Sequence, residues 1–149
     1  MIGNPVLRKK ARAVHKVTSE LVEFADSMEA LMRPTGVGLA APQVGRSEAF
    51  FIYDVGDGLR LIVNPQILER KGAASDEEGC LSVPDFTGNV ERRSALGVRY
   101  LTIDGGEAEL ETSGFEAVVL QHEIDHLDGV LFLDRIANVK RDLFKRKTY

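Results

Sequence analysis

The stretch His122-Glu123-Ile124-Asp125-His126 carries the most specific pattern in this chain and marks its central helix. The flanking residues predict a helix that starts at the capping box Ser113-Gly114-Phe115-Glu116 and ends before Gly129. Residues four positions apart lie on one helical face, so both imidazoles can bind one metal ion, with Glu123 beside the first as a general base. The alternative is a pair of histidines packed in a core helix with a surface glutamate.

A catalytic metal site needs a third protein ligand and an open position for water. No histidine or glutamate follows His126, and Asp134 is the downstream carboxylate that we consider. Upstream lies Cys80, the single cysteine, which on its own is usually a small buried hydrophobe. Because two imidazoles in the same chain lack a partner ligand, we favour coordination by Cys80, which predicts one thiolate, two imidazoles and a water.

Such a donor set supports hydrolysis of an amide. A divalent ion lowers the pKa of its bound water towards about 7, and Glu123 can take that proton and return it to a leaving amine. The developing oxyanion then needs hydrogen-bond donors besides the metal. The side-chain amide of Gln43 and the backbone N–H of Leu81, which follows the cysteine, are the candidates. Taken alone, Gln43 is better interpreted as an exposed loop residue.

The remaining patterns predict one α+β domain over residues 1–149. A first helix is predicted over residues 19–32, where apolar residues recur with helical spacing and Ser19 can cap the start. Residues 71–84 are polar and contain glycine, and no strand is assigned to them. We expect antiparallel β-sheets packed around a central helix that carries the HEXXH motif, with an N-terminal helix. The predicted strands span residues 49–55, 59–63, 66–70, 95–103 and 107–111.

Composition excludes several classes of protein. Hydrophobic residues make up 44% and charged residues 28% of the 149, so the chain is not globally disordered. A net charge of −4 excludes binding to nucleic acid or membrane mainly through bulk charge. One cysteine cannot form an internal disulfide, and neither a secretory signal nor an apolar run of roughly 20 residues is present. We therefore expect a cytoplasmic monomer without a specific nucleic-acid or membrane partner.

Three segments together resemble the motifs of the peptide deformylase family, enzymes that remove the formyl group from N-formylmethionyl nascent chains. They are Gly36-Val37-Gly38-Leu39-Ala40-Ala41-Pro42-Gln43, Glu78-Gly79-Cys80-Leu81-Ser82 and Gln121-His122-Glu123-Ile124-Asp125-His126. Their order and rough spacing also match, so the resemblance covers about residues 5–136. It implies a role in co-translational processing during protein biosynthesis.

The resemblance also implies roles for individual residues. Cys80, His122 and His126 would bind the metal, and Glu123 would be the general base and acid. Gln43 and the N–H of Leu81 would hold the formyl oxygen. In the family the native metal is usually Fe(II), with Zn(II), Ni(II) or Co(II) also bound, and the ligand types alone do not choose among these ions.

Family substrates lie extended against the first motif, where Gly36 and Gly38 permit a close approach. Val37, Val118 and Val119 are our candidates for the apolar pocket of the methionine side chain, and ordinary core packing explains the last two equally well.

Further charged residues are interpreted as follows. Asp125 is expected to orient a ligand histidine or support the helix. Arg92 and Arg93 are interpreted as surface strand residues, although either could neutralise Glu78 or Asp125. His15 is expected to be exposed. The basic residues 140–147 are expected to be an exposed helix end, with transient ribosome contact as the alternative.

Two competing functions remain. A zinc endopeptidase would use Asp134 as the third ligand and leave Cys80 without a role. A catalytically silent module on the same fold would bind metal or nascent chains without turnover.

Overall fold

The computed structural model describes residues 5–34, 36–80, 82–136 and 142–145, and for Asp76, Pro84 and Asp85 the backbone alone. The chain folds as an α+β protein with antiparallel sheets, as the sequence predicts. The α-helices are α1 (Ser19–Met32) and α2 (Gly114–Leu127), and the 3-10 helices are η1 (Pro5–Arg8), η2 (Ala41–Val44) and η3 (Phe132–Arg135). The strands are β1 (Gly38–Ala40), β2 (Phe50–Tyr53), β3 (Arg60–Lys71), β4 (Ala74–Cys80), β5 (Val83–Arg92), β6 (Ala95–Leu101), β7 (Glu107–Ser113) and β8 (Leu143–Lys145).

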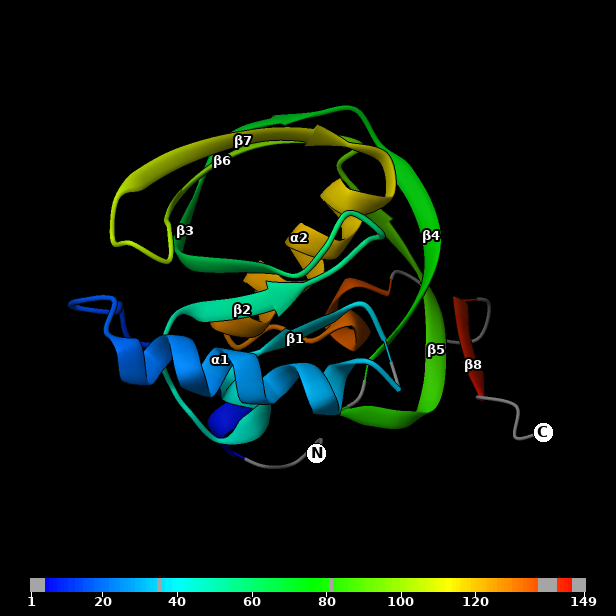
Figure 1. Ribbon diagram of the computed structural model, residues 1–149. Coiled ribbons are helices and arrows are strands. Elements are labelled where there is room, and N and C mark those ends of the chain that lie inside the picture. Colours follow the sequence, from blue (N-terminus) through cyan, green and yellow to red (C-terminus); the bar gives the residue numbers. More distant parts are fainter. Residues whose placement is uncertain (1–4, 35, 81, 137–141, 146–149) are drawn as a thin grey trace.

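Two antiparallel sheets surround the central helix. The first has the strand order β1-β2-β3-β6-β7 and the second has the order β4-β5-β8. In Figure 1, α2 lies in the middle of the molecule, with β6 and β7 above it, β4 and β5 to the right, and β1 and β2 below it. The helix α1 covers the outer side of β1 and β2. Of the described helices, none has the length and apolar character needed to cross a membrane.

The helix α2 is buried on nearly all sides, which agrees with its central place. Most of its apolar residues pack in one cluster with Phe51 and Tyr53 of β2 and with Leu96 and Val98 of β6. A helix that is apolar on most sides belongs in the interior of a protein rather than on its surface. The buried residues of α2 are Ala117, Val118, Val119, Leu120, Glu123, Ile124, Asp125, His126 and Leu127.

The helix ends differ from the sequence prediction in their caps. Thr18, and not Ser19, caps α1, because its Oγ1 accepts a hydrogen bond of 3.1 Å from the N–H of Leu21. At α2 the predicted capping box does not form, since Ser113 makes no side-chain cap bond. Glu116 instead accepts hydrogen bonds from the hydroxyls of Tyr53 and Thr112. The Glu116 carboxylate is thus hydrogen-bonded to residues of β2 and β7 and does not form the predicted capping box.

The first sheet contains the predicted hairpins with one difference. Pro65 does not divide residues 60–71, which form the single strand β3 with a register shift between Val63 and Gln66. Asn64 takes a positive φ of 50° at this point. Its side chain accepts from the N–H of Val14 at 2.7 Å and donates to the carbonyl of Val14 at 2.8 Å. These two hydrogen bonds therefore hold the N-terminal segment at Val14 against the first sheet.

The second sheet was missed by the sequence analysis. Residues 74–80 and 83–92 form β4 and β5, although their polar composition has low strand propensity. The strand β8 pairs with residues 86–88 of β5, so the described part of the basic segment, residues 142–145, contains a strand rather than a helix end. The other residues of that segment lie outside the described ranges. Pairing with a neighbour, and not local propensity, creates this sheet.

Gly129 ends α2 in a place where a side chain does not fit. Its φ is +76°, and an added Cβ would lie 2.5 Å from the carbonyl oxygen of Arg8. Gly105 has a similar φ of +82° but no atom within 4 Å of an added Cβ.

We predict that Gly105→Ala lowers the free energy of unfolding by about 1–2 kcal/mol through backbone conformation alone. Gly129→Ala should lower it by at least about 3 kcal/mol because the backbone clash is added. Urea unfolding of both variants tests this, and equal losses would contradict the clash.

Candidate active site

The three predicted metal ligands converge. The Nε2 atoms of His122 and His126, one turn apart on α2, lie 3.2 Å from each other, and Sγ of Cys80 lies 3.2 Å from Nε2 of His126. All three ligand atoms are within 4.8 Å of one another. Bond lengths of about 2.0 Å to nitrogen and 2.3 Å to sulfur imply ligand spacings of roughly 3.3–3.6 Å around one tetrahedral ion. The donor set therefore fits a single divalent ion.

The charges around the ligands also suit a cation. Burial lowers the pKa of His126 to about 3, which keeps this ring in the neutral form that ligates metals. Burial opposes protonation of His122 as well, but hydrogen bonds with Cys80 and Glu78 raise its pKa to about 10. The surroundings thus favour a positive charge at the centre of this group.

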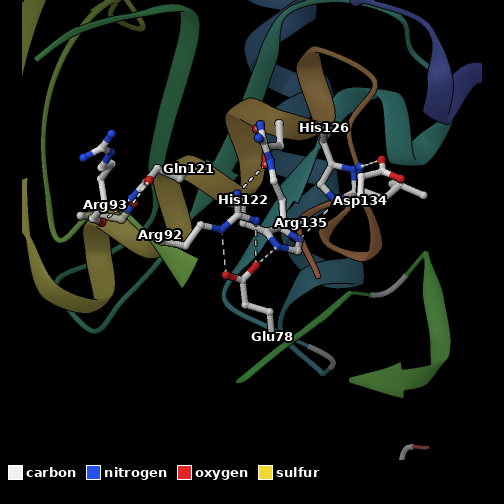
Figure 2. A network of polar contacts seen from close by, with 11 residues as sticks. Glu78, Arg92, Arg93, Gln121, His122, His126, Asp134 and Arg135 are labelled. Atoms are coloured by element: carbon white, nitrogen blue, oxygen red, sulfur yellow. Dashed lines mark hydrogen bonds and ion pairs between the residues drawn. The ribbon is translucent and has the colours of Figure 1, made fainter. Parts of the chain in front are cut away.

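A buried carboxylate orients the first histidine, and the sequence analysis missed this role. Glu78 on β4 accepts a hydrogen bond of 2.8 Å from Nδ1 of His122. Arg92 on β5 donates to the same carboxylate through Nε and Nη2, both at 2.9 Å (Figure 2). Although burial works in the other direction, Arg92 and His122 lower the pKa of Glu78. A signal was present, because Glu78 precedes Cys80 by two residues and alternate residues of a strand face the same side.

The interpretation of Arg92 as a surface residue is wrong. Arg92 is buried, whereas Arg93 is exposed as predicted and hydrogen-bonds through its backbone to Gln121. Asp125 contacts Arg92 and Arg135, so it supports the helix through two arginines. The histidine-orienting role considered for it belongs to Glu78. His15 is exposed, as expected.

Glu123 lies buried beside the ligands, with 2% of its surface exposed. Burial raises its pKa to about 7, and its Oε2 has no hydrogen-bond partner among the described residues. A carboxylate with a pKa near neutrality can both accept and return a proton. The side chain lies against Gly38 of β1, where an added Cβ would be 2.9 Å from Oε2.

Gln43 is part of the site and not an exposed loop residue. Its Oε1 accepts from the N–H of Ala40 at 3.0 Å, which orients the amide. Its Nε2 donates to Sγ of Cys80 at 3.2 Å and to Oγ of Ser82 at 3.1 Å. A hydrogen-bond donor is thereby held at the edge of the metal-ligand group. Leu81, the second predicted donor, lies outside the described residues.

A cavity of about 220 Å³ opens beside these groups. Gly36, Gly38 and Gln43 line it together with the predicted ligands Cys80 and His122 and with Glu123. Its apolar part is lined by the predicted Val37, Val118 and Val119 and also by Phe115, which the sequence analysis did not single out. Val119 belongs to the core cluster as well, so both interpretations of this residue hold.

Comparison with known proteins matches these features to one family. The family model described as polypeptide deformylase covers residues 1–142. The chain belongs to this family. A peptide deformylase of Syntrophobacter fumaroxidans is 44% identical over 97% of this chain and 88% of its own length. The crystal structure of the Thermotoga maritima deformylase shares 45% identity and a TM-score of 0.89, with 93% of this chain and 95% of that one covered. A deformylase of Acinetobacter baumannii, solved with Met-Ala-Ser bound, shares 40% identity and a TM-score of 0.84 over 90% and 94% of the two chains.

Deformylases are metal-dependent hydrolases that act on formylmethionyl nascent peptides, and this chain is an enzyme of that class. The resemblance seen in the three motifs is thus confirmed. The endopeptidase alternative is disfavoured, since Asp134 binds Arg8 and the N–H of Leu131 and is not in the Cys80-His122-His126 group. Family membership also favours a deformylase over a silent binding module.

Two strand glycines, Gly38 beside Glu123 and Gly97 outside the lining of the cavity, provide a matched test of the site. Gly38→Ala should lower kcat/KM for a formyl-Met peptide at least about tenfold, because the new Cβ displaces the buried Glu123. Gly97→Ala on β6 meets only atoms of Glu69, at 3.6 Å and beyond, and should change kcat/KM less than about threefold. Steady-state assays of formate release compare the variants. Equal losses would show that the space beside Glu123 is not what matters.

Proposed function

We propose that Cys80, His122 and His126 bind one divalent ion, natively Fe(II), and that Glu123 and Gln43 act on the formyl group of the substrate beside it. The observation that carries the proposal is the convergence of one sulfur and two ring nitrogens within 4.8 Å. Zn(II), Ni(II) or Co(II) would also suit thiolate and imidazole ligands. Metal analysis of protein purified without oxygen tests the identity of the native ion.

The ion, when bound, would lower the pKa of a water towards about 7 and polarise the formyl carbonyl. Glu123 would accept a proton from the attacking water and return it to the amino group that leaves as formate is released. The unpartnered Oε2 and the raised pKa of this carboxyl support such a role. Gln43, together with the backbone N–H of Leu81, would donate hydrogen bonds to the oxygen that gains negative charge.

The substrate would bind as an added strand. β1 is an edge strand of the five-stranded sheet and pairs on one side with β2, so an extended peptide can pair with its other side at residues 36–38. The methionine side chain would enter the apolar part of the cavity, between Val37, Phe115, Val118 and Val119. The Met-Ala-Ser peptide in the Acinetobacter relative supports this choice of substrate.

We infer that the chain acts as a single domain and as a monomer in the cytoplasm, where nascent peptides emerge. Transient contact with the ribosome would suit that role. The shape of the site supports a peptide partner, and neither a membrane nor a specific nucleic acid is proposed.

Glu123→Gln is the sharpest test of the proton-transfer role. Because the amide cannot accept the proton, formate release from formyl-Met-Ala-Ser should fall by about 10²–10⁴-fold. Bound metal, measured by elemental analysis, should stay at the wild-type ratio. Glu116→Gln on the same helix serves as control and should retain turnover, since Glu116 contacts Tyr53 and Thr112 rather than the ligands. Turnover that survives Glu123→Gln would refute the assignment.

Two variants, Cys80→Ser and Asp134→Asn, distinguish the proposed ligand set from the endopeptidase set, in which Asp134 would be the third ligand. Loss of the thiolate should lower the metal content of purified protein to well below one ion per chain, because a serine hydroxyl is a poor ligand at neutral pH. Asp134→Asn should leave the metal content unchanged. The reverse pattern would support the endopeptidase set and exclude our proposal.

A further inference from the structure

A chain of ionic contacts runs from the metal-ligand group to the surface. Nδ1 of His122 contacts Glu78, which contacts Arg92, and Nη1 of Arg92 contacts Asp125. Asp125 in turn accepts from Nη2 of Arg135 at 2.9 Å and from its Nε at 3.1 Å. Figure 2 shows Glu78, Arg92, His122 and Arg135 gathered beside α2. This series of ionic contacts joins β4, β5, α2 and η3.

The inner members of this series of contacts are buried, and its outer end is half exposed. Side-chain exposure is 6% for Glu78, 4% for Arg92 and 11% for Asp125, but 49% for Arg135. The charges alternate, so the two carboxylates and two guanidiniums balance. Removing one member of a buried ionic group leaves a charge without its partner, which is far more costly than the net value of the pair. Arg135 is therefore the accessible residue that completes a buried network.

The network reaches the ligands through one histidine. Nδ1 of His126 is buried and has no hydrogen-bond partner among the described residues. The ring of His122, in contrast, is oriented by Glu78 at 2.8 Å. A ligating imidazole whose other nitrogen is hydrogen-bonded is fixed in ring orientation and tautomer. A change in the network would consequently alter the position of His122 more than that of His126.

We propose that Arg135 is a positioning residue for the metal centre, acting through Asp125, Arg92 and Glu78 on His122. The inference rests on the metal binding proposed above. Arg92 is shared between two carboxylates, with Nε and Nη2 on Glu78 and Nη1 on Asp125. Arg135 satisfies Asp125 from the other side and so leaves Arg92 directed at Glu78.

Two effects of losing Arg135 oppose each other. Without Arg135, Asp125 would attract Arg92 more strongly, and the hydrogen bonds from Arg92 to Glu78 would weaken. Glu78 would then orient His122 less well for a metal ion. Loss of a positive charge would instead favour a cation at the centre. Water screens the charge of a side chain that is half exposed, so this second effect is small. The positional effect dominates, and metal binding becomes weaker.

The surroundings of Arg135 tolerate substitution. Arg135, Asp125 and Arg92 line a polar cavity of about 400 Å³, and its lining residues differ from those of the catalytic cavity. A shorter or uncharged side chain there leaves space that water can fill. A change in metal affinity would then not arise from a defect in the apolar core.

The experiment compares the Zn(II) dissociation constants of variants, measured by competition with a chelator. Arg135→Gln should raise the constant about three- to tenfold, less than the 10- to 100-fold typical of direct partners of ligands. Arg135→Lys should recover most of the affinity. Arg8→Gln is the matched control, because Arg8 binds Asp134 of the same helix η3 without touching Asp125. It should leave the constant within about twofold of wild type.

Two further readouts separate positioning from a merely structural role. In Zn(II)-loaded, ¹⁵N-labelled protein, the Nδ1 proton of His122 should exchange with water faster in Arg135→Gln but not in Arg8→Gln. In a Glu78→Gln background the effect of Arg135→Gln on Zn(II) affinity should vanish, since the series of contacts from Arg135 to His122 is already interrupted at Glu78.

The outcomes are distinct. Failure of the wild-type chain to bind Zn(II) would overturn the proposed metal centre itself. Wild-type binding with an unchanged or tighter constant in Arg135→Gln would overturn the role of Arg135 alone. Equal weakening by Arg8→Gln would also overturn it, because docking of η3 would then be the cause.

Discussion

The buried ion pair between Glu78 and Arg92 is the interaction on which the arrangement of this site depends. The proposed cysteine ligand lies on a strand of the small sheet, and the proposed histidine ligands lie on the helix between the sheets. Arg92 on β5 holds Glu78 on β4 by two hydrogen bonds, and Glu78 holds His122. Breaking such a buried pair from one side typically costs about 3–5 kcal/mol. The pair thus gives the small sheet a fixed position relative to α2.

The central helix combines two environments that seldom occur together. One side of α2 contributes Ala117, Leu120 and Leu127 to the apolar core. Its other positions carry buried polar groups, and Asp125 finds partners in neighbouring elements. Buried polar atoms without partners are costly unless they serve chemistry or a ligand. The described residues leave two such side-chain atoms, on Glu123 and His126, and both belong to the proposed catalytic group.

Close packing against α2 also explains the small residues of the first motif. Gly38 places backbone directly against Glu123, and no side chain could occupy that space without moving the carboxyl. The same strand is an edge strand of the large sheet. One segment thereby confines the proposed base on one side and presents hydrogen-bonding backbone to a peptide on the other.

Local patterns predicted a large part of this structure. The two helices and the β2–β3 and β6–β7 hairpins follow from apolar periodicity and turn residues. The missed elements lack an apolar alternation. β4 and β5 are neighbours in sequence and pair as a hairpin, with Cys80 opposite Val83, but their residues are mostly polar, and β8 pairs with the distant β5. Leu31 illustrates the same limit, because it belongs to the apolar pattern of α1 and yet is 54% exposed.

The sequence by itself determined which kinds of side chain form the site, namely thiol, imidazole, carboxyl and amide. It also determined the helical spacing of the two histidines, since a four-residue separation places side chains on one face wherever the helix lies. Only the tertiary structure decided that Glu78, and not Asp125, orients His122, and that Arg92 is buried. Residues 78, 92 and 122 meet because of strand register and sheet packing, which depend on the whole chain and leave no periodic signal in any short segment of it.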